Sequence, residues 1–197
     1  MEYSELLIKR RSSYMLKKEK VVDDEILIDK ISKVILNTPT AFNSMATHIV
    51  IGLGENHNFI WDTTKETLKK IVSPEAFKKT GPKIDVFKNA YGTVLIYKDI
   101  EDIEGLKKAV PSFANRQDNW AEQNIGILAY AIWLELVDLG YGVNMQHYDP
   151  LIDADLAQKF AIPAAWKLEA QIVFGKEVIK PDKKEFKPIE ERLKVFR

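Results

Sequence analysis

The sequence contains no cysteine and only three histidines. Without thiols there can be no disulfide framework, thiol nucleophile or zinc–thiolate site, and an intracellular protein is the simplest expectation. His48, His57 and His147 lie far apart, and none has a carboxylate at metal-ligand spacing. We therefore expect no metal site.

Net charge is also absent, because 29 Lys and Arg offset 29 Asp and Glu. The charge is nevertheless uneven, since residues 9–20 carry a local +5 and residues 176–197 a local +3. A nucleic-acid-binding face would need a domain-wide basic excess. Two basic ends instead favour one small anion held between converging termini, and no nucleic-acid partner is expected.

Long hydrophobic runs are lacking as well. The longest apolar window, about residues 125–143, contains Glu135 and Asp138, which would be costly inside a bilayer. The first five residues do not have the basic-then-apolar order of a signal peptide. We expect a soluble cytoplasmic protein with no membrane partner.

The chain has enough apolar residues for a core, with 46% hydrophobic residues over a length of 197. One domain over residues 1–197 is expected. Apolar periodicity predicts a short helix that ends at Arg10 and further helices at about 24–38, 59–71, 74–89, 103–109, 119–139 and 151–160. Strands are predicted at 47–53, 92–97, 143–146 and 168–174. Two helices often separate successive strands, which indicates an α+β fold with a small mixed sheet.

Arg10-Arg11-Ser12 follows the first predicted helix. Two guanidinium groups and a hydroxyl match the oxygens of a phosphate. Basic residues at the end of a helix also complement its dipole, so the motif alone leaves both interpretations open.

Asn43-Ser44 lies in a loop that begins at Pro39. A carboxamide in such a loop can bind the polar edge of a heterocycle, or it can bond only to its own backbone in an Asx turn. A glycine motif, Gly52-Leu53-Gly54, also follows a strand, but His57 replaces the third glycine of the dinucleotide-binding fingerprint. We interpret it as an ordinary turn at the end of a strand.

The predicted helix at 119–139 is apolar nearly all round and leads through Gly140-Tyr141-Gly142 into Asn144, Gln146 and His147. Such a helix is expected to be buried. The polar strand after it is either the wall of a ligand site or an exposed edge strand. No nucleophile motif accompanies it, which suits an enzyme whose cofactor carries the chemistry.

These segments, together with Gln171–Gly175 and Lys184–Arg192, resemble the FMN-dependent nitroreductase family. More narrowly, the chain resembles the branch that includes the yeast fatty-acid-repression proteins. The resemblance implies a nitroreductase-like α+β fold and an obligate homodimer, with two FMN sites that are each built from both subunits. It also implies that the tail, about residues 176–197, packs on the partner subunit.

The resemblance further implies roles for nine cofactor-binding residues. Arg10, Arg11 and Ser12 would lie near the flavin phosphate, Asn43 and Ser44 beside the isoalloxazine, and Gln146 and His147 against the ring from the opposite side. Lys184 and Lys187 would add positive charge near the phosphate. No residue is assigned as catalytic, because hydride transfer depends mainly on orientation of the rings.

The resemblance implies an NAD(P)H-dependent oxidoreductase that reduces nitroaromatic or quinone-like acceptors by a ping-pong reaction, with a role in oxidative-stress defence. Two departures from the family pattern leave a non-catalytic flavin-binding or stress-signalling dimer as the alternative. Met45 replaces a glutamine that could donate to the flavin, and Tyr14 replaces a cation near the phosphate.

Overall fold

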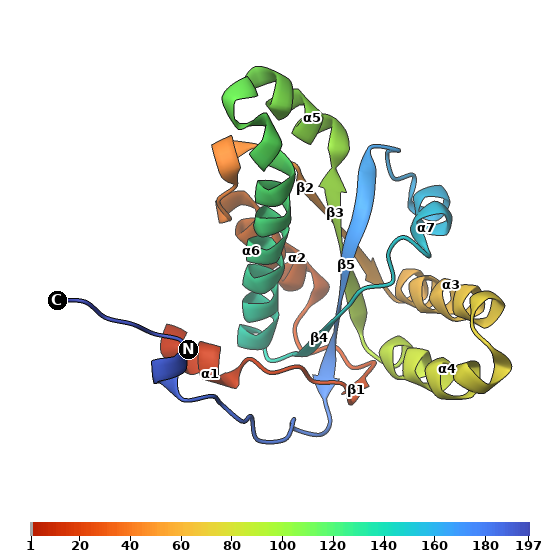
Figure 1. Cartoon of the computed structure of the whole chain (residues 1–197). Helices are drawn as coiled ribbons and strands as arrows, with labels where there is room; N and C mark the ends of the chain where they lie inside the picture. Colours follow the sequence, from red (N-terminus) through yellow and green to blue (C-terminus); the bar gives the residue numbers. More distant parts are fainter. Residues whose placement is uncertain (1) are drawn as a thin grey trace.

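The computed structural model describes residues 2–197 as three layers, with a central sheet between two groups of helices (Figure 1). The sheet contains β1 (Leu16–Lys17), β2 (Thr47–Leu53), β3 (Gly92–Asp99), β4 (Gly142–Gln146) and β5 (Trp166–Glu177). The α-helices are α1 (Tyr3–Lys9), α2 (Asp24–Asn37), α3 (Glu55–Ile71), α4 (Pro74–Lys88), α5 (Ile100–Ala109), α6 (Gln117–Asp138) and α7 (Asp153–Phe160). Three short 3₁₀ helices, η1 (Ala41–Asn43), η2 (Pro111–Arg116) and η3 (Ile189–Glu191), complete the elements.

The sheet is antiparallel, so the prediction of a mixed sheet is wrong. β5 pairs with β3 on one side and with β4 and β1 on the other, and β3 pairs with β2. The helix pair α3–α4 between β2 and β3 explains this direction, because one helix carries the chain back and the next carries it forward again. Parallel pairing appears in residues 2–197 only as the isolated bridge between Ser12 and Val143.

Alternation along the strands divides the core between the two faces of the sheet. Val94 and Ile96 face α2 and α6, whereas Leu95 and Tyr97 face the layer formed by α3, α4 and α7. All four side chains are at most 2% exposed. A strand with apolar residues on both faces therefore lies at the centre of the sheet.

The predicted helices and strands are confirmed, and most of their ends are shifted by a few residues. α3 begins at Glu55 and α7 at Asp153, and Asp23 is the N-cap of α2 but makes no capping bond through its side chain. Its carboxylate instead pairs with Lys20 at 2.8 Å. None of the helices in residues 2–197 combines the length and apolar character needed to cross a bilayer.

His57 explains why the glycine motif at the end of β2 is not a nucleotide site. Its ring is fully buried, with Nδ1 2.9 Å from Thr93 Oγ1 and Nε2 3.1 Å from the carbonyl oxygen of Lys88. The Trp61 indole N–H also donates to Thr93 Oγ1. His57 thus fills the space beside the strand and fixes α3 to the sheet.

His57 should make the protein less stable in mild acid. Burial lowers its pKa from 6.5 to about 4. The unfolded chain therefore binds a proton at a higher pH than the folded chain, so the stabilisation present above pH 6.5 is lost as the pH falls towards 4. The loss should reach about 3 kcal/mol, measured by urea unfolding at several pH values. In a His57→Gln variant the free energy of unfolding should depend less on pH between 6.5 and 4. An equally steep dependence would contradict the role given to His57.

Candidate flavin site

Both basic ends of the chain meet in one cavity of about 590 Å³ below α6, which we call the basic pocket. Arg10, Arg11 and Ser12 line it from the segment after α1, and Lys184 lines it from the tail. The convergence predicted from the charge distribution is therefore present within one chain. The remaining lining residues are Tyr14, Met15, Ile179, Lys180, Pro181 and Asp182.

The segment from Arg10 to Ser13 is held against the edge of the sheet. Ser12 bridges to Val143 of β4, and the Ser13 amide donates to the carbonyl oxygen of Val143 at 2.8 Å. The Asn144 carboxamide donates to the carbonyl oxygen of Ser13, also at 2.8 Å. These bonds fix the backbone that carries the two arginines.

A second cavity of about 430 Å³ lies between α6 and the strands β4 and β5, and we call it the α6 pocket. Met145 and His147 line it from β4 and the residue that follows, and Trp133 lines it from α6. Arg10 connects the two cavities, because its guanidinium lies 4.9 Å from the centre of the Trp133 ring. A ligand with an anionic end and a flat apolar ring would match the two cavities in that order.

Charged side chains occupy one end of the α6 pocket. A β-bulge between Ile96 and Tyr97 leaves Glu169 without a Cα partner on β3, and Glu169 lies 2.8 Å from Lys98. Burial raises the pKa of Glu169. Lys98 also pairs with Glu122 at 2.5 Å. The charge of the two carboxylates is thus partly offset by one lysine.

Gln146 and His147, predicted together on one wall, have different environments. His147 lines the α6 pocket, whereas Gln146 is 8% exposed and donates through Nε2 to Asn144 Oδ1 at 2.9 Å. The alternative of an exposed edge strand is wrong for these amides, because Asn144 is completely buried. Gln146 is therefore part of an ordered polar row beneath the site.

Asn43 and Ser44 are not brought together with Arg10 in one chain. The η1 turn lies near the first half of α6, where the Ala41 amide donates to Asn124 Oδ1, whereas Arg10 contacts Trp133. Asn124 and Trp133 are nine positions apart along the helix, which corresponds to about 14 Å. The two predicted parts of the site are thus separated along α6.

The backbone of the Asn43 loop is strained. Phe42, Asn43 and Met45 all have positive φ, at 54°, 52° and 52°. For residues other than glycine this costs on the order of 1 kcal/mol or more each, and such strain is concentrated at ligand sites. The Asx-turn interpretation finds no support, because Asn43 makes no side-chain hydrogen bond within residues 2–197.

The two lysines predicted from the tail lie in different environments. Lys184 lines the basic pocket, whereas Lys187 is exposed and lines none of the cavities described here. The tail also exposes large apolar side chains, with Phe186 at 78% and Phe196 at 90%. A surface of this kind is expected to be covered by another chain.

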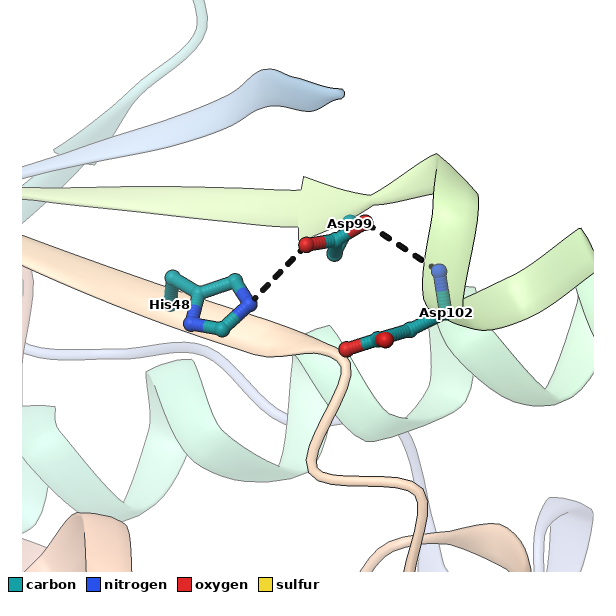
Figure 2. A group of neighbouring side chains, drawn as sticks. All are labelled: His48, Asp99 and Asp102. Carbon is teal, nitrogen blue, oxygen red and sulfur yellow. Dashed lines mark hydrogen bonds and ion pairs between the residues drawn. The ribbon is translucent and has the colours of Figure 1, made fainter. Parts of the chain in front are cut away.

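One group of side chains could offer ligands to a metal ion. His48, Asp99 and Asp102 place their ligand atoms within 4.8 Å of one another (Figure 2). Asp99 is the N-cap of α5, accepting from the amides of Glu101 and Asp102, and it lies 3.3 Å from His48 Nε2. The His48 ring also stacks on Trp166 at 3.9 Å. These contacts explain the group as packing at the start of α5, and the absence of a metal site stays a prediction.

The residues present fit FMN. The basic pocket supplies two arginines, two lysines and a serine hydroxyl for a phosphate, against the single carboxylate of Asp182. The α6 pocket supplies apolar walls for a ring system. The indole Nε1 of Trp133 is buried with no partner among residues 2–197, so a donor is available at that wall.

Comparison with known proteins decides the family. Residues 7–176 match the model of the nitroreductase family. This chain belongs to the nitroreductase family. It is therefore an oxidoreductase by family, with the fold that the resemblance implied.

Other nitroreductases resemble this one over nearly its whole length. HBN1 of Saccharomyces cerevisiae is 36% identical over 188 residues, which cover 93% of this chain and 92% of HBN1, and the yeast nitroreductase FRM2 is 31% identical over the same shares. The nitroreductase CinD from Lactococcus lactis, solved in complex with chloramphenicol, is 32% identical and superposes with a TM-score of 0.91 over 100% of both chains. A nitroreductase with bound FMN from Desulfitobacterium hafniense shares the fold, with a TM-score of 0.71 at 15% identity over 98% of this chain and 97% of that one.

Proposed function

We propose that this nitroreductase is a homodimer that binds FMN and uses NADH or NADPH to reduce nitroaromatic or quinone-like acceptors by a ping-pong reaction. The main support is the basic pocket, where Arg10, Arg11 and Ser12 meet Lys184 from the other end of the chain. The bound flavin would supply the hydride chemistry. A role in oxidative-stress defence is part of this proposal.

Arg10, Arg11, Ser12 and Lys184 would hold the phosphate, and His147 would lie along the ring in the α6 pocket. Both arginines can form two parallel hydrogen bonds with phosphate oxygens. The apolar side chains of the α6 pocket would keep water from the reacting ring. The protein thus orients two flat molecules against each other, and orientation is what hydride transfer chiefly requires.

A partner copy would complete each site. The exposed stripe of α6 contains Gln123, Gly126, Ile127 and Tyr130, and it lines a shallow apolar hollow together with Tyr3, Ala131 and Leu134. Two such helices packed antiparallel about the middle of the hollow, between Leu128 and Ala129, would set Asn124 of one subunit level with Trp133 of the partner subunit. The Asn43 loop of one subunit would then reach the Arg10–Trp133 contact of the other, which supports a site shared between two chains. In that assembly the tail, about residues 176–197, would pack on the partner.

The compounds that were solved in complex with CinD indicate the class of acceptor. CinD has been solved in complex with chloramphenicol and with 4-nitrophenol, both of which carry a nitro group on a benzene ring. CinD covers this whole chain at 32–34% identity. We carry the acceptor class over to this protein as a proposal on that basis.

The visible spectrum of the purified protein tests the function. A yellow protein is expected, and NADH added without oxygen should bleach the flavin band. Adding a quinone or nitroaromatic compound should then restore it. A colourless protein that retains no added FMN would overturn the proposal, and a flavin that dithionite but neither NADH nor NADPH reduces would favour the non-catalytic alternative.

A further inference from the structure

Three aromatic side chains gather beside the strained loop. Phe42 of η1, Phe113 of η2 and Trp120 of α6 have ring centroids 5.6 to 6.1 Å apart, and we call them the aromatic cluster. Phe42 is 52% exposed and Phe113 is 46% exposed. Aromatic side chains that could pack inside the core instead present their rings to the outside, next to Asn43.

Arg116 lies over this cluster without a charged partner. Its guanidinium is 6.0 Å from the centre of the Trp120 ring. Within residues 2–197 its side chain forms no ion pair or hydrogen bond. Contact with an aromatic face leaves the N–H groups around the guanidinium rim free to bind an oxyanion.

The nearest acids on α6 do not neutralise Arg116, because each is paired with a lysine. Asp118 lies 2.8 Å from Lys107, and Glu122 lies 2.5 Å from Lys98. The positive charge of Arg116 is therefore available to a ligand. An exposed aromatic platform with a free guanidinium at its rim matches a flat ring that carries a carboxylate.

We infer that Phe42, Phe113, Trp120 and Arg116 form an acceptor subsite that favours negatively charged aromatic compounds, with nitroaryl carboxylates as the simplest class. This inference rests on the proposed function, in which the Asn43 loop reaches the flavin site of the partner subunit. The rings of the aromatic cluster stack against the acceptor, and Arg116 binds its carboxylate. Arg116 is thus a specificity-determining residue rather than a catalytic one.

The test compares 4-nitrobenzoate with 4-nitrobenzamide, which match in size and differ in charge. The quantity measured is kcat/KM for 4-nitrobenzoate divided by kcat/KM for 4-nitrobenzamide, with NADH at low ionic strength. This ratio should be about tenfold lower in Arg116→Gln than in the unmodified protein. Comparing the ratio between proteins cancels the intrinsic reactivity of the two compounds. Arg116→Lys should give an intermediate ratio, because it keeps the charge and loses the planar fork.

Salt and a control variant separate electrostatic selection from a change in folding. Added salt should lower the ratio in the unmodified protein and have little effect in Arg116→Gln, because screening weakens exposed charge pairs. Lys79→Gln, which removes an exposed charge from α4, should leave the ratio unchanged. Titration of the oxidised protein with benzoate and benzamide, followed by the flavin absorbance, should show the same change in relative affinity.

An unchanged ratio in Arg116→Gln, or an equal fall in Lys79→Gln, would overturn the inference and leave the proposed function intact. Reduction of neither compound by the unmodified protein, with its flavin bound, would overturn both. The two failures are therefore distinguishable.

Discussion

Replacing Arg10 and Arg11 together by alanine is expected to give a colourless protein with FMN affinity at least about a hundredfold weaker. Both side chains line the basic pocket, and a hydrogen bond to a charged group contributes about 1.5–3 kcal/mol. The two losses should combine, because in the proposed site each arginine would contact the same dianionic phosphate. Equilibrium titration with FMN, followed by flavin fluorescence, measures the effect.

Riboflavin provides the internal control, because it has the same ring and no phosphate. Its affinity should change much less than that of FMN in the double variant. A matched variant, Lys78→Ala with Lys79→Ala, removes the same charge from two exposed positions on α4 and should retain the flavin. Equal losses of FMN and riboflavin affinity would show that the arginines act through folding rather than through the phosphate.

Replacing Ile127 by aspartate is expected to convert the proposed dimer to monomers and to remove the proposed flavin at the same time. Ile127 is 46% exposed in one chain and lies near the middle of the exposed stripe of α6. Antiparallel pairing would bring the two new carboxylates close together in an apolar interface, where an unpaired charge costs several kcal/mol. Dimerisation should weaken at least about a hundredfold.

Sedimentation at several protein concentrations, with the flavin absorbance recorded alongside, gives both quantities in one experiment. Ile71→Asp is the matched control, because Ile71 is 57% exposed at the end of α3, on the other side of the molecule. It should remain a dimer with bound flavin. A monomeric Ile127→Asp variant that binds FMN normally would contradict a site shared between two subunits.

The sequence predicted most helices and strands because the spacing of their buried apolar residues follows the period of a helix or a strand. The strand from Thr47 to Leu53 was predicted to the residue, and α6 to within two residues at either end. β1 was missed, since a strand of two residues has no detectable period. Strand direction was predicted wrongly because it depends on how α3 and α4 reverse the chain, which no short window of sequence contains.

In the candidate site, too, the sequence predicted some residues and could not predict others. The arginine motif and the basic tail could be found from charge alone, and the structure brings Arg10 and Lys184 to one cavity. Arg116 and its aromatic platform were missed, because Phe42 and Phe113 lie 71 residues apart in the sequence and meet only in the fold. A phenylalanine inside each of two short 3₁₀ turns could have been the signal.

The sequence by itself determined the class of fold, the family and the two basic segments, because hydrophobic period, motif order and charge are properties of the linear chain. The tertiary structure decided which of these residues share a site. It joined the segment after α1 and the start of the tail in the basic pocket, and it separated the Asn43 loop from Arg10 along α6. The physical reason is that the apolar faces of a helix and a twisted sheet pack closely, which fixes the distances between residues far apart in the sequence. The local spacing of apolar residues does not determine those distances.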